Sequence, residues 1–340
     1  MQISYFSSPY VSFHRAAGGY RWCLRRMGHA VGDDHARGDL VILHGEPQIF
    51  PSVLQEFPPA PGRPVVGCLA WEHRVLTHDQ RAGLALLDEV WVPSGFCRDC
   101  LAPHHGNVHV IPFVVAPPQT DEASLAWLHS EIGHRAGSFC FYAITRPGDP
   151  RKNLEATFDA FARLGGRGDV RLLVKYPPGI EEPTGTLPPG VTMLGGAWPT
   201  TRLNALHHTG RVFVNSHRAE GWGMGITEAM ALGRIAIATG YSGNMDFMTA
   251  QDSFPLPWRP VPIDAETLET LGLAQPADGP LTWAEVDGDA LEAAMRTCLE
   301  HWDALEPMRQ RAAAAMRRFY PDVVIGRLQE RLAALVPGAG

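Results

Sequence analysis

Two glutamates on either side of a glycine-rich turn are the side chains in this sequence best suited to chemistry. Glu220 and Glu228 have seven residues between them, and glycines occupy positions 221, 223 and 225. A carboxylate accepts hydrogen bonds from two neighbouring sugar hydroxyls. Glycines let backbone N–H groups approach a ligand, and a helix that begins there presents its positive end to an anion such as a diphosphate. The alternative is an ordinary strand–turn–helix unit whose acids only favour the helix start.

The elements around this turn must hold it at the end of a buried strand. Residues 211–215 have the short apolar pattern of a strand, a helix is expected from about Gly225 to Leu232, and residues 235–239 form the next strand. Gly233 is placed to end the helix. This order indicates one repeating unit of an α/β fold.

The stretch from Asn215 to Thr239 resembles the Glu-x7-Glu motif of the family 4 retaining glycosyltransferases. That family has the GT-B fold, two facing Rossmann-like domains with a central cleft. The resemblance implies that Glu220 contacts the transferred sugar and that Glu228 contacts the nucleotide ribose. The amides expected to bind the donor phosphates are those of Gly223, Met224, Gly225 and Ile226. Met224 and Gly225 stand where the family more often has Leu and Pro, which makes the turn less rigid.

A second match lies in the loop after the predicted strand at residues 139–144. Arg146 and Lys152, six positions apart, resemble the pair that clamps the donor diphosphate in this family. Fixed cations there would stabilise the charge that develops on the leaving nucleotide. A lone Arg or Lys in a loop is usually only solvated, whereas the combination with the two glutamates favours a clamp. Leu194 marks the loop against which the nucleotide base is expected.

The N-terminal part of the chain has the pattern of a small parallel sheet. Its short, β-branched apolar runs are residues 2–6, 39–43, 64–71, 89–93 and 108–112. Gly18 and Gly19 precede an expected helix and resemble the N-terminal glycine pair of the family, which faces the donor across the cleft. Glu72 and His73 follow the third run, where ligands of open α/β sheets gather. Either side chain is a candidate to orient the acceptor hydroxyl.

The resemblance implies two domains. Residues 1–116 would form the acceptor-binding domain, shortened relative to the family and completed by a C-terminal helix at 321–337 that crosses back. Pro, Gln, Thr and acidic residues from 117 to 137 indicate a linker, so the donor-binding domain would span 138–320. Within it, residues 251–281 are rich in proline and are expected to be irregular.

A helix is expected to open at Trp283 and to run to about Trp302. Asp287 and Asp289 form a D-x-D at its start, with no strand expected before them. We interpret this pair as a helix N-cap rather than as a metal-binding signature.

Composition excludes several classes of protein. The 340 residues carry a net charge of −7, which argues against nucleic-acid binding, and no run of 18 apolar residues or signal-like start occurs. We therefore expect a cytoplasmic protein. Cys97 and Cys100 form an isolated C-x-x-C and are predicted to be free thiols. The doublets 104–105 and 207–208 are histidines without partners at metal-ligand spacing, so we expect surface residues and no metal site.

One helix face admits two interpretations. Its basic and aromatic residues are Arg15, Arg21, Trp22, Arg25 and Arg26. Such a face is either simply solvated or makes a peripheral membrane contact.

These observations lead to one functional hypothesis and two alternatives. We expect a retaining glycosyltransferase that moves a sugar from a nucleoside-diphosphate donor, with UDP or GDP as the nucleotide, to a hydroxyl acceptor. The resemblance implies attack on the face that the phosphate leaves, without a metal or another cofactor. The alternatives are a catalytically inactive nucleotide-sugar-binding subunit and a GT-B phosphorylase or epimerase.

Overall fold

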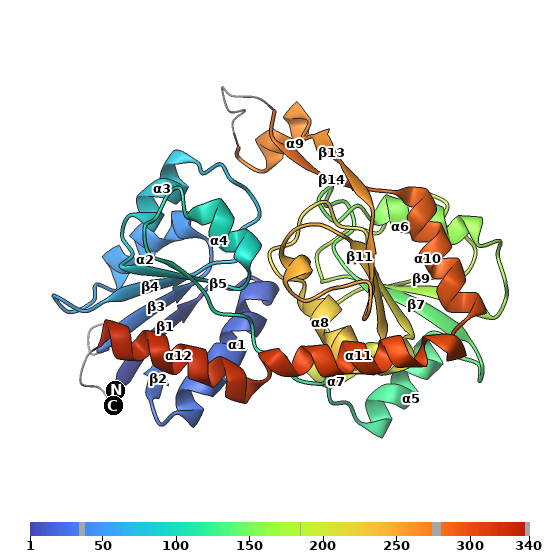
Figure 1. Ribbon diagram of the computed structural model, residues 1–340, viewed down its shortest axis with the longest axis horizontal. Helices are drawn as coiled ribbons and strands as arrows, with labels where there is room; N and C mark the ends of the chain where they lie inside the picture. The colour runs from blue at the N-terminus through green and yellow to red at the C-terminus, as the bar shows by residue number, and fades with distance from the viewer. Residues whose placement is uncertain (34–37, 184, 274–279, 337–340) are drawn as a thin grey trace. The chain divides into compact units, whose positions relative to one another are not determined.

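The structure is a computed structural model that describes residues 1–33, 38–183, 185–273 and 280–336. The chain divides into two compact units (Figure 1), each containing one six-stranded parallel sheet. Unit 1 consists of residues 1–115, 264–280 and 318–340, and unit 2 consists of residues 116–263 and 281–317. The fold class is thus α/β with two Rossmann-like domains, as the sequence predicts.

The sheet of unit 1 has the strand order β2-β1-β3-β4-β5-β6. Its strands are β1 (Gln2–Ser7), β2 (Ala30–Gly32), β3 (Leu40–His44), β4 (Val65–Cys68), β5 (Glu89–Val92) and β6 (Val108–Val110). The helices are α1 (Val11–Arg26), α2 (Phe50–Glu56), α3 (His78–Leu84), α4 (Gly95–Leu101), α9 (Ala265–Thr270) and α12 (Pro321–Leu335). Every residue of β3, β4 and β5 is buried, which is the pattern of a sheet covered on both faces.

The C-terminal helix belongs to unit 1. Helix α12 packs against α1, and the two helices cross in the view of Figure 1. Arg331 of α12 forms an ion pair with the buried Glu89 of β5 at 2.5 Å, which ties the helix to the sheet. Residue 337, the last of the predicted crossing helix, lies outside the described residues.

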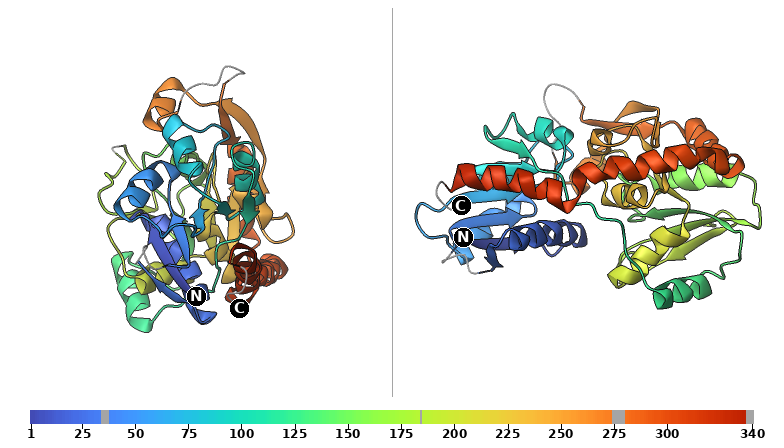
Figure 2. Two further views of the ribbon diagram at one scale, coloured as in Figure 1. Left: turned by 90° about the vertical axis from the view of Figure 1, so that its left-hand side faces the viewer. Right: turned by 60° about the horizontal axis from the view of Figure 1, so that its bottom comes forward.

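The sheet of unit 2 has the order β12-β11-β10-β7-β8-β9. Its strands are β7 (Phe139–Ile144), β8 (Val170–Lys175), β9 (Val191–Leu194), β10 (Val212–Asn215), β11 (Ile235–Thr239) and β12 (Phe254–Leu256). The helices are α5 (Glu122–Glu131), α6 (Leu154–Arg163), α7 (Thr200–Thr209), α8 (Met224–Ala231), α10 (Gly288–Glu300) and α11 (Glu306–Met316). Helices α6 and α10 pack together, as do α8 and α11 (Figures 1 and 2). Because strand order reverses at β7, right-handed crossovers put α6 and α8 on opposite faces of the sheet.

Two predictions for the C-terminal third were wrong. Residues 251–281 are not irregular throughout, because they contain β12, β13 (Trp258–Pro262) and α9, although residues 274–279 lie outside the described residues. The helix predicted from Trp283 begins only at Gly288, after β14 (Thr282–Val286), which pairs antiparallel with β13. Ala284 and Val286 are buried hydrophobic residues at alternating positions, a strand pattern that the acidic residues beside them obscured.

The N-cap interpretation of the D-x-D is confirmed. The Asp287 carboxylate accepts hydrogen bonds from the amides of Asp289 and Ala290, at 2.9 and 3.0 Å, where α10 begins. A strand does precede the motif, contrary to expectation.

The predicted linker is not a plain connection. Its helix α5 packs on α7, and Thr120 donates to the carbonyl oxygen of Thr201 at 2.8 Å, so this segment is part of unit 2. Over the described parts of the chain, no helix is both long enough and apolar enough to cross a bilayer.

Candidate active site

The side chains predicted to bind a diphosphate lie at the topological switch point of the unit 2 sheet. From β7 the chain builds outward to β8 and β9, and it then returns to add β10, β11 and β12 on the other side. The loops after β7 (residues 145–153) and after β10 (residues 216–223) therefore flank the point where strand order reverses. Ligands of open α/β sheets bind at this point, outside the carboxyl ends of the strands.

Lys152 and Glu220, one from each loop, form an ion pair. Lys152 Nζ lies 2.7 Å from Glu220 Oε2, and the two side chains are 18% and 16% exposed. Burial alone would raise the pKa of Glu220, but the charges of Lys152, Arg151 and His217 outweigh it and hold that pKa well below its usual range. Glu220 is therefore an ionised acceptor, and its partner is one of only two lysines in the sequence, the other being Lys175.

The two loops are also joined through their backbones. The Arg218 amide donates to the carbonyl oxygen of Arg151 at 2.8 Å, and Arg151 Nη1 donates to the carbonyl oxygen of Ala219 at 3.3 Å. Asp149 pairs with Arg151 Nη2 at 3.3 Å. Arg151 thus holds a fixed position beside the ion pair.

The glycine-rich turn has the predicted form. Gly223 adopts φ +95°, which favours glycine, and is the N-cap of α8, so the helix begins with its N-terminal amides at this edge of the sheet. One assigned donor is already engaged, because the Ile226 amide donates to the carbonyl oxygen of Gly223 at 3.0 Å. The amides of Gly223, Met224 and Gly225 remain the predicted phosphate donors.

A third loop, after β11, supports the turn from behind. Ser242 Oγ accepts from the Glu220 amide at 2.8 Å, and the Gly243 amide donates to the Glu220 carbonyl oxygen at 2.8 Å. Ser242 has φ +74°, a strained conformation for a residue with a side chain. A Cβ on Gly243 would lie 2.0 Å from the carbonyl oxygen of Gly221, so only glycine fits there. Sequence reasoning missed the contact of this loop with Glu220.

Glu228 has a protein neighbour that the sequence did not predict. Its Oε2 atom lies 3.2 Å from Nε2 of His207 on α7, and His207 is completely buried, with a hydrogen bond between its Nδ1 and Tyr142 Oη at 3.0 Å. The prediction that His207 lies on the surface was therefore wrong. His208, half-buried, bonds the Pro118 carbonyl oxygen at 2.9 Å, so this doublet is structural.

Arg146 lies in the same loop as Lys152, and its side chain is exposed. It forms no ion pair with another residue in the described ranges, so the loop presents two paired cations, Arg151 and Lys152, and one solvated cation.

At the end of β8 the second lysine has a structural role. Lys175 is buried, and it donates to the carbonyl oxygens of Tyr176 and Gly196, the latter at 2.7 Å. Its Nζ lies 4.8 Å from the centroid of the Trp198 ring, and burial lowers its pKa to about 8. Leu194, assigned to the base-binding loop, is the buried last residue of β9.

In unit 1, the predicted glycine pair is misplaced. Gly18 and Gly19 lie inside α1, which begins at Val11, rather than in a loop before it. Gly19 brings the helix against Val114, because a Cβ at this position would lie 3.0 Å from Val114 Cβ. Gly19 therefore serves helix packing within unit 1, whereas a Cβ on Gly18 would meet nothing within 4 Å.

Glu72 and His73 follow β4 at the carboxyl edge of the unit 1 sheet, and both are half-buried. The preceding Trp71 is anchored by Cys97, whose Sγ donates to the Trp71 carbonyl oxygen at 2.9 Å and lies 3.3 Å from the Trp71 amide. The position of Glu72 and His73 agrees with the predicted edge.

Sequence reasoning missed Glu46, which follows β3 at the same edge. Burial raises its pKa, although a hydrogen bond from its own amide and the Ser8 hydroxyl both lower it. The Oε2 atom of Glu46 is buried and has no hydrogen-bond partner. No pattern of glycines or cations marks this residue in the sequence.

The basic face of α1 is partly occupied. Arg21 donates to the Tyr5 carbonyl oxygen and pairs with Asp33 at 3.4 Å, and Arg25 donates to the Val31 carbonyl oxygen at 3.2 Å. Trp22 is 52% exposed.

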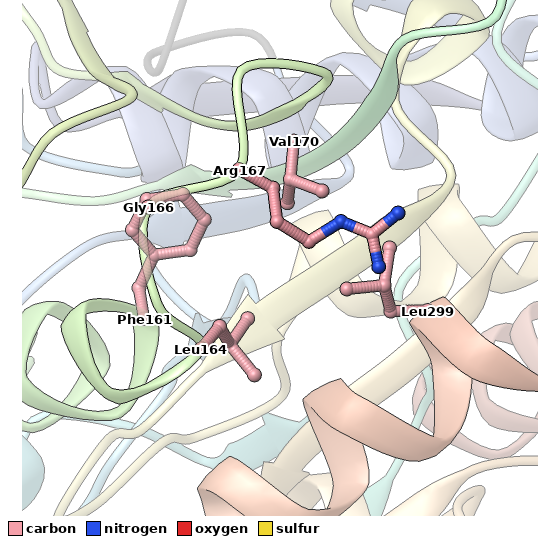
Figure 3. Close-up of a pocket in the computed structure, with 6 residues that line it drawn as sticks. All are labelled: Phe161, Leu164, Gly166, Arg167, Val170 and Leu299. Atoms are coloured by element: carbon pink, nitrogen blue, oxygen red, sulfur yellow. The ribbon is translucent and has the colours of Figure 1, made fainter.

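Elsewhere in unit 2 the described residues form a small pocket and a wider hollow of about 380 Å³, which is lined by residues that include Arg211 and Trp302. The pocket in Figure 3 has a volume of about 10 Å³, room for no more than a water molecule. Its lining residues are Phe161, Leu164, Gly166, Arg167, Val170 and Leu299. No group of three or more His, Cys, Asp or Glu side chains that could hold a metal ion occurs in the described ranges. Cys97 and Cys100 are buried free thiols, as predicted.

Comparison with known families identifies the second domain. The family described as "Glycosyl transferases group 1" matches residues 139–256, a range that contains Lys152, Glu220, Ser242 and the whole sheet of unit 2. A comparison with curated proteins gives no match.

Solved glycosyltransferase structures share the whole fold. HepE from Anabaena, solved in complex with UDP-glucose, is 15% identical, with a TM-score of 0.68 over 98% of this chain and 100% of that one. A glycosyltransferase from Rickettsia africae is 11% identical, with a TM-score of 0.68 over 99% of each chain. Sucrose-phosphate synthase from Thermosynechococcus elongatus is 16% identical, with a TM-score of 0.62 over 97% of this chain and 81% of that one. At these identities the likeness shows the fold, which is GT-B.

Proposed function

We propose that this protein, a glycosyltransferase with a group 1 domain at residues 139–256, is a retaining enzyme that uses a nucleoside-diphosphate sugar and no metal. The observation that carries the proposal is the Lys152–Glu220 ion pair of 2.7 Å at the switch point of the unit 2 sheet. A cation and a carboxylate side by side match the two halves of a sugar diphosphate. The cation suits the phosphates, and the carboxylate suits the sugar hydroxyls.

Each residue then has a defined task. Lys152 binds the diphosphate, with Arg151 fixed beside it and the exposed Arg146 free to reach the same group. The amides of Met224 and Gly225 add hydrogen bonds at the N-terminus of α8. Glu220 accepts hydrogen bonds from the sugar hydroxyls and sets the orientation of the anomeric carbon.

The reaction exchanges one bond at that carbon. The bond from the anomeric carbon to the diphosphate oxygen breaks, and the acceptor oxygen forms a new bond on the same face. The acceptor proton passes to an oxygen of the departing diphosphate. The leaving nucleoside diphosphate gains negative charge in this step, so Lys152 and the helix amides stabilise the transition state more than the bound substrate.

The remaining assignments follow from position. Glu72 and His73, at the carboxyl edge of the unit 1 sheet, would orient the acceptor hydroxyl. Glu228, on α8 after the turn, would contact the ribose and is held beside His207. Because HepE was solved with UDP-glucose, uridine diphosphate sugars are the first donors to test, with GDP sugars next.

The test is a transfer assay with a panel of nucleotide sugars in the presence of a chelator. We expect one donor to be hydrolysed or transferred, with the same anomeric configuration in product and donor by NMR. Inverted product would contradict the retaining assignment, and loss of activity with chelator would contradict metal independence. Donor binding without any turnover would indicate the inactive nucleotide-sugar-binding subunit instead.

A further inference from the structure

We propose that Glu285, on strand β14, is a positioning residue that fixes the two loops carrying Lys152 and Glu220. This inference rests on the proposed function, because it assigns Glu285 to the same donor site. Glu285 lies outside the family match at residues 139–256 and outside the Glu-x7-Glu motif.

One carboxylate joins the two loops. Glu285 Oε2 accepts from Arg218 Nε at 2.7 Å, and its Oε1 accepts from Asn153 Nδ2 at 3.2 Å. Arg218 stands two residues before Glu220, and Asn153 directly follows Lys152. Glu285 therefore holds a neighbour of each member of the ion pair.

The Arg218 side chain is fixed on several sides. Besides the contact with Glu285, its Nη1 donates to the Pro150 carbonyl oxygen at 2.8 Å. The guanidinium carbon lies 5.1 Å from the ring centroid of the buried Trp283, a cation–π arrangement. The Ala284 amide donates to the Arg218 carbonyl oxygen at 3.0 Å. Strand β14 therefore contacts both the backbone and the side chain of Arg218.

The contact at Asn153 also reaches a demanding backbone position. Asn153 is buried and left-handed, with φ +49°, where it begins α6. Asparagine tolerates this conformation better than most residues. Its carbonyl oxygen accepts from Ser216 Oγ at 2.6 Å, so Asn153 links the loop after β7 to the loop after β10. Through Glu285, both loops are also linked to β14.

Charge gives Glu285 a second role. With its carboxylate in place, the positive charge of Arg218 is balanced at 2.7 Å. Without that carboxylate, an uncompensated guanidinium would lie in the same loop as Glu220 and compete with Lys152 for it. Glu285 thereby keeps Glu220 and Lys152 paired with each other.

The test compares two glutamates that each bind two partners. Glu285→Gln keeps the size of the side chain but removes its charge and one hydrogen bond, and we expect kcat to fall about tenfold to a hundredfold. The acceptor KM should stay unchanged. In a Lys152→Ala background, Glu285→Gln should lower kcat by less than it does in the parent, because one of the two side chains that Glu285 positions is gone.

Glu292→Gln is the matched control. Glu292 on α10 pairs with Arg163 at 2.9 Å and with Arg296 at 2.6 Å, and neither partner belongs to the site loops. We expect this variant to keep the parent kcat. Hydrogen exchange in residues 150–153 and 216–220 should be faster in Glu285→Gln than in Glu292→Gln.

An unchanged kcat in Glu285→Gln overturns the inference whatever the exchange shows, because the contact would then be structural only. An additive loss in the Lys152→Ala background overturns it as well. Full activity of Lys152→Ala would instead overturn the donor site itself, and with it both proposals, so the two failures are distinguishable.

Discussion

The carboxyl edges of the two sheets each contain a point where strand order reverses, but they differ in side-chain chemistry. In unit 2 the loops at the switch point carry ions that pair with each other, with Lys152 and Glu220 at 2.7 Å. In unit 1 the switch point lies between β1 and β3, and the loops there carry Ser8 and Glu46. Burial raises the pKa of Glu46, and its buried Oε2 atom has no hydrogen-bond partner.

This difference shows that a shared fold does not determine which ligand an edge accepts. Four charged side chains are linked in unit 2, because Glu285 pairs with Arg218 beside the Lys152–Glu220 pair. At such an edge, a charged ligand can take the place of one protein partner in an ion pair. The unit 1 edge offers an unsatisfied carboxyl oxygen, which suits a neutral hydroxyl donor. The comparison is consistent with a donor site in unit 2 and an acceptor site in unit 1.

The largest effect is expected at the paired ions. Lys152→Ala and Glu220→Ala should each lower kcat by about 10² to 10³, roughly 3–4 kcal/mol of transition-state stabilisation, by analogy with the loss of one fixed donor in an active site. Steady-state kinetics with a saturating donor measures this effect. Arg296→Met, which breaks an ion pair on α10 instead, is the control and should keep the parent kcat. Equal activity of the three variants would remove the functional distinction of this edge.

A smaller effect should separate activity from stability at Ser242. Ser242→Gly relieves the strain of φ +74° but removes the hydroxyl that accepts from the Glu220 amide. We expect thermal stability to be unchanged or higher, whereas kcat falls about tenfold, the equivalent of 1.4 kcal/mol. Ser242→Ala keeps the strain and loses the same bond, so it should be the less stable of the two. A parent-like kcat in Ser242→Gly would show that the β11 loop does not position Glu220.

At the unit 1 edge, Glu46→Gln should change stability in a pH-dependent way. The raised pKa of Glu46 means that folding favours its protonated form, so its contribution to stability is present below the ordinary carboxyl pKa and is lost as pH rises through the raised value. Glutamine resembles the protonated acid at every pH. We expect Glu46→Gln to be more stable than the parent by about 1 kcal/mol at neutral pH and no more stable at pH 4.

Thermal denaturation at the two pH values checks this prediction. A variant that is less stable at neutral pH would show that the Glu46 carboxylate is well solvated or paired in the folded protein. Glu56→Gln, at the exposed end of α2, is the control variant.

No effect is expected at the thiols near the same edge. Burial raises the pKa of both Cys97 and Cys100 to about 12, so neither forms a reactive thiolate at pH 8. A thiol reagent should modify them only after unfolding, and reducing agents should leave activity unchanged. Rapid labelling in the native protein would contradict the burial of this pair.

The sequence predicted the strands and the main pair of the site for identifiable reasons. Short β-branched runs are distinctive for a parallel sheet, and the glycines around Glu220 mark a turn that only small residues fill. The loop with Lys152 was found through its family resemblance. These signals are local, so they survive in a single sequence.

The parts of the site that sequence reasoning missed depend on contacts between residues that are far apart in the sequence. Glu285 lies 67 positions from Arg218 and 132 from Asn153, and His207 lies 65 positions from Tyr142, so no local pattern announces these pairs. Gly18 and Gly19 were misread because a glycine pair usually ends a regular element. Here Gly19 lies within α1 instead, and the absence of a side chain lets Val114 pack closely against the helix.

The most direct test of the donor site is calorimetric titration of the parent and of Lys152→Ala with a nucleoside, its monophosphate and its diphosphate. We predict that the parent binds the diphosphate most tightly and that Lys152→Ala loses about tenfold to a hundredfold of that affinity, the usual contribution of a charged hydrogen bond. Affinity for the nucleoside alone should not change. Equal diphosphate affinity in the two proteins would contradict the placement of the donor phosphates at Lys152.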